Sequence, residues 1–184
     1  MSKKWAIIVA IVVTLFAGLY FGSPYWAVRN FQAAAKSGDV DALEATVDFP
    51  VVRENLKSQL TSALVDKLQN DPEMAKNPFA GLGMMMMPAM VNGMVDAFVT
   101  PEGIARLAKS GHVQKQADEN EPVDGASQPD ISYSYSGLDR FRVTMRPKDK
   151  ADDKRDVGLL FERRGLFGWK MIRIEIPDEA FTEK

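Results

Sequence analysis

Apolar and polar residues follow each other along this chain in distinct patterns, and the first is an unbroken apolar run. It extends from Trp5 to Phe21 and is followed by the aromatic pair Tyr25 and Trp26. Its 17 residues would form a helix of about 25 Å, close to the hydrocarbon thickness of a bilayer when the flanking aromatic rings lie among the headgroups. We therefore predict a membrane anchor over residues 5–22.

Helical periodicity follows the anchor. Ser23-Pro24 is typical of a helix start, so the anchor is expected to end there and a surface helix to begin. Gly38-Asp39 is typical of a helix end followed by the cap of a next helix. A long amphipathic helix is predicted from an apolar stripe at four-residue spacing, Val52, Leu56, Leu60, Leu64 and Leu68. Further helices are expected between Pro88 and Val99 and from the Thr100-Pro101 cap to Gly111.

After the helices, the pattern changes to that of a polar loop followed by strands. Residues 113–130 hold almost no apolar side chain, which predicts a loop. Period-two alternation predicts four strands, at residues 131–135, 141–145, 157–161 and 169–176. Short turns between them imply an antiparallel meander over residues 131–177. With helices over residues 24–111, the chain is predicted to be an α+β protein whose helical layer packs on the sheet, in one domain over residues 24–184.

Charge near the anchor predicts the side of the membrane on which the domain lies. Lys3 and Lys4 hold a short tail, residues 1–4, in the cytoplasm, so the domain is predicted to be exported. Cleavage of the anchor is not expected, because bulky residues stand three positions before each candidate cut. In a bacterium, this predicts a single-pass inner-membrane protein with a periplasmic domain. Cysteine is absent and the net charge is −2, which argues against disulfides, thiolate chemistry and nucleic-acid binding.

Several segments carry a resemblance to known families. SPYWAVRNFQAAAKSGDVDALEATVDFPVVRENLKSQL, NPFAGLG, VTPEGIARL, LDRFRV and FERRGLFGWKMIRIEIP resemble a bacterial family catalogued as domain of unknown function 2939. That family has no assigned activity, so the resemblance implies no catalytic residue. The order of helices before a curved antiparallel sheet is also similar to NTF2-like cone folds, which host enzymes and binding modules alike.

Catalytic motifs are absent from the chain: it has no GxSxG elbow, no phosphate loop and no paired-histidine zinc motif. The only histidine, His112, lies at the start of the polar loop and is interpreted as a loop residue. Asp48 and Asp139 fit turns. Asp96 has no evident local role in an otherwise apolar segment, so a buried Asp96 acting as a base or facing a ligand is the enzymatic alternative. No cofactor or metal site is predicted.

The most unusual segment is rich in methionine and spans residues 78–99. Met86, Met90 and Met94 recur at helical spacing beside Asp96. Three interpretations remain open. The methionines fill the core in place of leucine, or they line an apolar cavity or the membrane interface, or their thioethers bind Cu(I). Under the second interpretation, Met86, Met90, Met94 and Asp96 are candidate ligand-binding residues.

Arginine gathers on one face of the predicted sheet. Arg140 and Arg142 alternate with apolar neighbours, and Arg173 does the same in the last strand. This face is interpreted as solvated, or as a contact surface for anionic headgroups or an acidic partner.

These observations together favour a membrane-anchored periplasmic binding or interaction module without catalysis. Its expected partners are the bilayer through residues 5–22 and either a membrane protein or an apolar ligand. The alternative is a cone-fold enzyme or lipid binder that uses a buried carboxylate and a Met-lined cavity.

Overall fold

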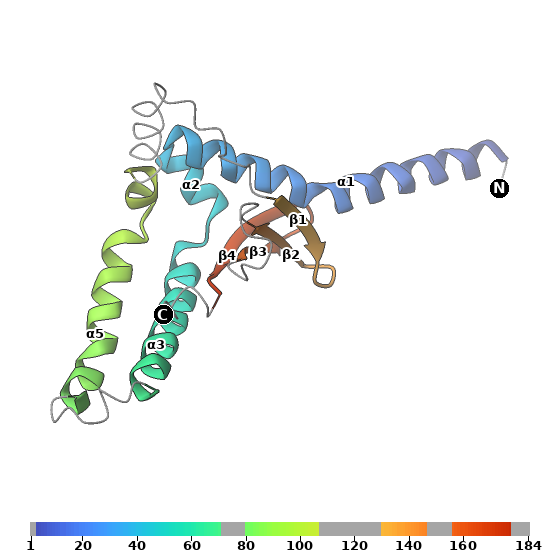
Figure 1. Ribbon diagram of the computed structural model, residues 1–184. Coiled ribbons are helices and arrows are strands. Elements are labelled where there is room, and N and C mark those ends of the chain that lie inside the picture. The colour runs from blue at the N-terminus through green and yellow to red at the C-terminus, as the bar shows by residue number, and fades with distance from the viewer. Residues whose placement is uncertain (1–2, 71–79, 107–129, 147–155, 178–184) are drawn as a thin grey trace, which may run out of the picture.

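A long helix and a four-stranded sheet dominate the α+β fold. The computed structural model describes residues 3–70, 80–106, 130–146 and 156–177. Helix α1, Lys3–Ser37, runs across the sheet and projects far beyond it (Figure 1). In the described part of the chain, α1 is the one helix long and apolar enough to cross a membrane, and none of its most apolar 18-residue window is buried.

Pro24 lies inside α1 rather than at a helix start. The expectation that a new helix begins at Ser23-Pro24 is therefore wrong, and residues 22 and 24 belong to one continuous helix. A proline inside a helix removes one N–H and leaves the carbonyl four residues earlier, here that of Tyr20, without its helical donor. The Ser23 hydroxyl donates to that carbonyl at 2.9 Å, which helps the helix to continue.

Two further helices follow α1 in the chain and contact the sheet. Gly38 adopts a φ of 64°, the left-handed conformation expected at a helix end. Asp39 caps α2, Val40–Thr46, by accepting a hydrogen bond from the amide of Ala42 at 3.1 Å, which confirms the predicted boundary. Helix α3, Phe49–Gln69, follows at once. The amide of Asp48 donates to the carbonyl of Met171 at 2.9 Å and thereby ties the α2–α3 link to the sheet.

The methionine-rich segment forms helix α5, Ala80–Phe98, with Pro88 inside it. The prediction of a helix starting at Pro88 was therefore too short. Helices α3 and α5 lie side by side as a hairpin at the end of α1 remote from the N-terminus (Figure 1). Residues 101–106 are also helical, and Thr100 caps them by accepting from the amide of Gly103 at 2.9 Å. The predicted continuation to Gly111 lies outside the described residues.

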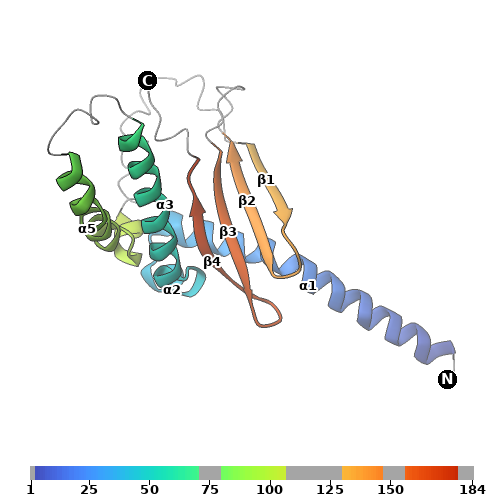
Figure 2. The same ribbon diagram turned by 90° about the horizontal axis from the view of Figure 1, so that it is seen from below.

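The sheet is the predicted antiparallel meander, with strand order β1-β2-β3-β4. The strands are β1 Asp130–Tyr135, β2 Arg140–Arg146, β3 Val157–Arg164 and β4 Gly168–Glu175. Strand β1 begins at Asp130, which had been assigned to the loop; the rest of that predicted loop, residues 113–129, lies outside the described residues. The β1–β2 and β3–β4 turns lie at the same end of the sheet, which points toward the N-terminal half of α1 (Figure 2).

Helix α3 covers the β4 edge of the sheet. The side-chain amide of Asn55 donates to the carbonyl of Ile172 at 3.0 Å, and that of Gln59 donates to the carbonyl of Ile174 at 2.9 Å. These bonds satisfy edge groups that would otherwise invite another strand. Between the sheet and the helices lies the core, whose most buried members are Leu43, Val47, Val52, Phe141, Val143, Phe161 and Met171.

Candidate functional site

The candidate site is built around Arg163, near the end of β3. It is 9% exposed and is the one charged side chain that is buried among the described residues. The backbone places it, because its amide donates to the carbonyl of Asp139 at 2.9 Å. Gly165, with a φ of 77°, then allows the tight β3–β4 turn. Arg163 consequently lies where both sheet turns meet α1.

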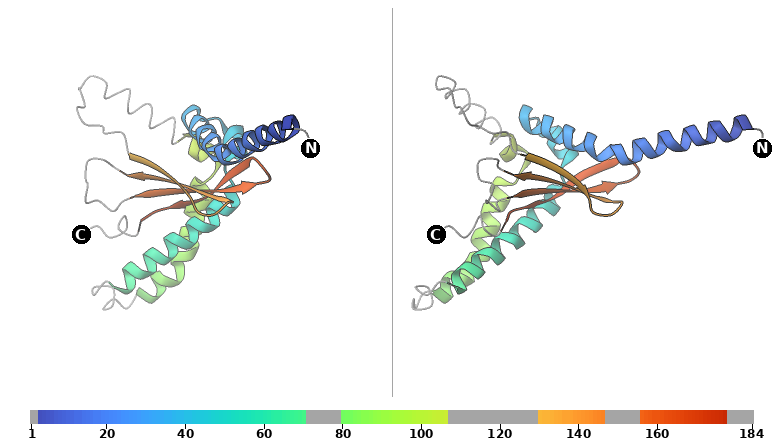
Figure 3. Two further views of the ribbon diagram at one scale, coloured as in Figure 1. Left: turned by 90° about the vertical axis from the view of Figure 1, so that its right-hand side faces the viewer. Right: turned by 45° about the vertical axis from the view of Figure 1, so that its right-hand side comes forward.

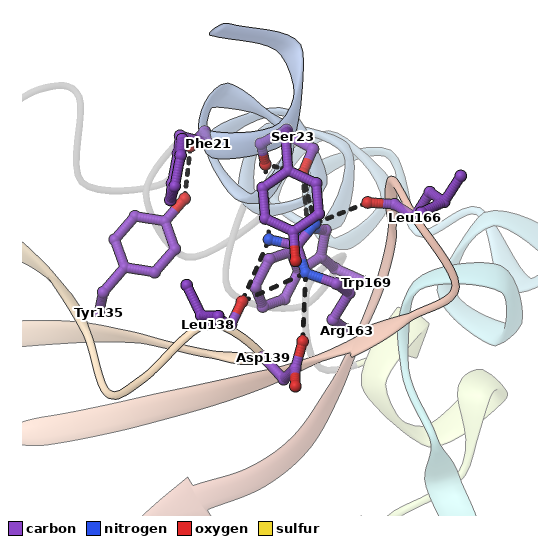
Figure 4. Close-up of polar contacts among 9 residues, drawn as sticks. Phe21, Ser23, Tyr135, Leu138, Asp139, Arg163, Leu166 and Trp169 are labelled. Atoms are coloured by element: carbon purple, nitrogen blue, oxygen red, sulfur yellow. Dashed lines mark hydrogen bonds and ion pairs between the residues drawn. The ribbon is translucent and has the colours of Figure 1, made fainter. Parts of the chain in front are cut away.

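The guanidinium of Arg163 binds carbonyls of three different segments (Figure 4). It donates to Leu138 in the β1–β2 turn at 3.2 Å through both Nε and Nη2, and to Leu166 in the β3–β4 turn at 2.6 Å. A longer bond of 3.4 Å reaches the Tyr20 carbonyl in α1. That carbonyl is the one that Pro24 deprives of its helical donor, so the proline and the arginine complement each other.

Two aromatic rings enclose the same guanidinium. Its carbon lies 3.7 Å from the ring centroid of Tyr20 and 4.3 Å from that of Trp169. The Trp169 indole also donates to the hydroxyl of Ser23 at 2.8 Å. Arginine is suited to this position because its flat, fork-shaped cation stacks on rings while its N–H groups bind oxygens in its plane. We call Arg163 with Tyr20, Ser23, Leu138, Leu166 and Trp169 the Arg163 junction.

Tyr135 adds a second link between β1 and α1. Its hydroxyl donates to the carbonyl of Phe21 (Figure 4), and its ring packs edge-on against Phe21 and Trp169. Partial burial raises the pKa of the Tyr135 phenol, against an opposing effect of the positive charge of Arg163. The protonated donor form is therefore the one that the junction holds.

The junction fixes the sheet against α1. All buried side-chain polar atoms among the described residues have hydrogen-bond partners, which is what a buried cation requires. Sequence reasoning missed this cluster, because its members come from segments far apart in the chain and no spacing connects them. The one available signal was Pro24 in an otherwise continuous helical pattern, which implies a carbonyl in need of a donor.

The methionines singled out in the sequence lie on the outside of α5. Met86, Met90 and Met94 are 64%, 77% and 47% exposed, so the core interpretation is wrong for these three. The side of α5 that faces inward carries the buried residues Val91 and Val95. Large exposed apolar residues recur every four positions and so wind gradually around α5. We call Leu82, Met86, Met90, Met94 and Phe98 the Met ridge.

The candidate carboxylates are engaged at the surface. Asp96 forms an ion pair of 2.8 Å with Lys57 of α3, and its side chain is 51% exposed. Asp48 pairs with Arg164 at 3.1 Å. Asp139 lies 3.6 Å from Arg163 with its side chain 72% exposed. His112 lies outside the described residues, and within the described ranges no group of three or more His, Cys, Asp or Glu is arranged to hold a metal ion.

The three arginines of the predicted contact face have different surroundings. Arg142 pairs with Glu175 of β4 at 3.0 Å. Arg173 donates to the side chain of Asn55 at 2.9 Å. Arg140 is exposed at the start of β2, close to the β1–β2 turn. The strand registers place all three on one face of the sheet, where Glu162 and Glu175 lie among them. The role of this face as a contact surface stays a prediction.

A groove borders the junction along α1. It has a volume of about 690 Å³ and lies between α1, the end of α2 and the β3–β4 turn. Its wall includes Gly18, Leu19 and Gly22 of α1 and Phe167 of the turn, and none of its described lining residues is acidic. Its apolar wall suits hydrocarbon more than a polar substrate.

Comparison with known proteins yields one match. The family model described as Protein of unknown function (DUF2939) matches residues 13–107, which is just over half of the chain. The match includes the Met ridge and the α1 part of the junction, while Arg163 and the sheet lie outside it. No curated protein and no solved structure matches the chain. The similarity to NTF2-like cone folds therefore stays a prediction.

Proposed function

This chain belongs to the family described as Protein of unknown function (DUF2939), and because that description assigns no activity, we propose a function from the geometry. We propose that α1 is an uncleaved single-pass anchor in a bacterial inner membrane. The anchor holds the periplasmic domain at a fixed orientation, and the domain presents the Met ridge to a protein partner. The protein is thus an interaction module.

The anchor part of this proposal rests on the contrast within α1. Its N-terminal half is apolar but exposed, with Ile7, Val12 and Leu15 each about 60% exposed. A buried core helix would have such side chains covered. The same helix continues into the domain, where Val28 and Ala34 are buried. A continuous helix clamped by Arg163 transmits orientation from the membrane to the domain, unlike a flexible linker.

The single observation that carries the interaction role is the exposure of the Met ridge. Its five side chains are 58%, 64%, 77%, 47% and 62% exposed in chain order, and Met85 beside them is 82% exposed. A row of large exposed apolar side chains along one helix is typical of binding sites. Methionine suits such a surface, because its flexible thioether adapts to varied partners.

The location of the ridge favours a protein as its partner. Helix α5 lies at the end of α1 opposite the exposed apolar half (Figure 1), so the membrane crossed by α1 does not cover it. The ridge follows the outside of a helix rather than the wall of a closed cavity, and a small apolar ligand would stay wet on one side. The Lys57–Asp96 pair beside it is the polar rim that protein interfaces commonly have. The enzymatic alternative gains no support from Asp96, which is ion-paired at the surface.

A photo-crosslinking experiment in intact membranes tests the interaction. A photoreactive amino acid replaces Phe98 on the ridge of the full chain, in cells that naturally produce it. We expect a discrete adduct heavier than the chain, because the probe lies within the apolar contact. The matched probe replaces Asn92, which is exposed on the same helix but off the ridge, and should give no such adduct.

A second substitution separates a specific partner from random collision. Met90→Lys should abolish the Phe98 adduct, because it places a charge in the centre of the apolar contact, whereas Met90→Leu should retain it. An adduct that survives Met90→Lys, or equal adducts from both probe positions, would refute the role of the ridge. An adduct of twice the mass of the chain would identify a second copy as the partner.

A further inference from the structure

We infer that the β1–β2 and β3–β4 turns insert into the outer leaflet of the membrane, beside the point where α1 leaves it. The surface is formed by Leu138, Leu166 and Phe167, and its partner is lipid. This inference rests on the proposal that α1 crosses the membrane. It adds that the folded domain is itself partly immersed.

The first argument is the depth in the membrane at which the two turns contact α1. A hydrocarbon core of about 30 Å corresponds to about 20 helical residues, so a span that starts at Trp5 reaches roughly to residue 25. The turns contact α1 earlier than that: the ring of Phe167 packs against Phe16 with centroids 5.7 Å apart, and Arg163 reaches Tyr20. Tilting α1 would bring more of its residues into the membrane and not fewer.

The side chains at the tips are the second argument. Leu138 is 62% exposed, Leu166 61% and Phe167 44%, and such apolar side chains are uncommon at the tips of turns that face water. In the β1–β2 turn, the exposed Asp139 follows Leu138. Both turns point along α1 toward its exposed apolar half, away from α3 and α5 (Figure 3). These apolar side chains thus continue the apolar surface of α1 onto the domain.

The hydrogen bonding of the turns is the third argument. Irregular backbone tolerates membrane depth only where its polar groups are satisfied by protein. Arg163 binds the carbonyls of Leu138 and Leu166, one from each turn. The amide of Ser136 donates to the carbonyl of Arg140 at 2.9 Å. The buried arginine therefore satisfies one carbonyl in each of the two turns at a level where water would be absent.

One end of the groove beside the junction lies at the same level. There its walls join Gly18 and Leu19 of α1 to Phe167 of the turn, and its other end reaches Asn30 of α1 and Thr46 of α2; it is open rather than enclosed (Figure 4 shows the adjoining junction). Water in this apolar groove would be unfavourable. Immersion of the turns lets lipid acyl chains fill it.

Spin labelling tests the inference on the full chain. The protein has no cysteine, so single substitutions Leu138→Cys, Leu166→Cys, Val12→Cys and Met90→Cys each give one labelled site. The labelled proteins are reconstituted in vesicles of phosphatidylethanolamine and phosphatidylglycerol. Accessibility of each nitroxide to oxygen and to a water-soluble nickel complex is then measured. All four sites are exposed in the structure, so the label itself should be tolerated.

We expect labels at Leu138 and Leu166 to be accessible to oxygen and protected from nickel, as at Val12, whereas the label at Met90 is accessible to nickel. If the Val12 label is protected while either turn label is fully accessible to nickel, the inference is overturned and the anchor stands. If the Val12 label is itself accessible to nickel, the proposed anchor fails and the inference fails with it. The two failures are therefore distinguishable.

Discussion

At the scale of single residues, the pairing of Pro24 with Arg163 explains how an anchor helix and a folded domain become one unit. The proline frees a carbonyl of α1, and the guanidinium supplies a donor to it across the fold. The same guanidinium stacks on Tyr20 and Trp169. A lysine in its place would keep the charge but lose both the fork of donors and the flat stacking surface.

We therefore predict that Arg163→Met destabilises the full chain by about 2–4 kcal/mol, because turn carbonyls lose charge-assisted bonds and two ring contacts are lost. In detergent, the thermal midpoint should fall by about 2–4 °C per kcal/mol. Arg163→Lys should recover only part of this loss.

The neighbouring Arg164 provides the matched control. Its side chain is 46% exposed and forms surface pairs with Asp48 and Glu162. Arg164→Met should cost less than about 1 kcal/mol. Equal effects of the two substitutions would show that Arg163 is an ordinary surface arginine and not a clamp.

At the scale of elements, α5 divides its apolar residues between two sides. Val91 and Val95 are buried in the hairpin, whereas the residues of the Met ridge are exposed. Helix α3 likewise has two roles, since it supports α5 and covers the β4 edge through Asn55 and Gln59. The ridge is therefore held by a supported hairpin rather than by an isolated helix.

Replacing Met86, Met90 and Met94 together by leucine should leave the fold intact. Each substitution should change the unfolding free energy by no more than about 0.5 kcal/mol, because exposed positions without special contacts tolerate change. Val95→Ala, at a site 2% exposed, should cost on the order of 2 kcal/mol and serves as the sensitive control. Thermal unfolding of the three proteins measures the contrast.

The same triple variant tests the copper interpretation. Titration with Cu(I) against a competing chelator should show no saturable binding by the parent, and so no loss on substitution. Stoichiometric Cu(I) retention by the parent that disappears in the leucine variant would overturn this expectation, since thioethers are the soft ligands Cu(I) prefers.

At the scale of the whole molecule, the exposed apolar part, the junction and the helical hairpin follow each other along α1 (Figures 1 and 3). If α1 crosses the membrane, the sheet turns are the part of the domain nearest to the bilayer. Helix α5, which carries the Met ridge, lies at the opposite end of α1. The rigid connection between α1 and the domain then keeps the Met ridge at a defined distance from the bilayer.

At this scale we predict the membrane topology: the N-terminus lies in the cytoplasm and the C-terminus on the other side of the membrane. A fusion of alkaline phosphatase, an enzyme active only after export, behind Lys184 should be active, because Lys3 and Lys4 keep the N-terminus in the cytoplasm. Reversal of Lys3 and Lys4 to glutamate should reduce that activity. An inactive parent fusion, or a mature chain that begins near Gly22, would contradict the uncleaved anchor.

Much of the fold could be predicted from local signals. Apolar alternation located the four strands of the sheet, and Asp39 and Thr100 located helix starts by capping. The errors lay at Pro24 and Pro88, both of which are inside helices. Proline is a strong local signal against helix, but tertiary contacts and substitute donors outweighed it at Pro24.

The sequence by itself determined the apolar span, the order of helices before strands and the recurrence of methionine, because each depends on periodicity within a short segment. Only the tertiary structure decided that Arg163 meets Tyr20 and Trp169, that Asp96 pairs with Lys57, and that the Met ridge faces outward. Periodicity identifies which residues share a side of a helix. Which side is covered depends on the packing of segments distant in the chain, and no local pattern encodes that choice.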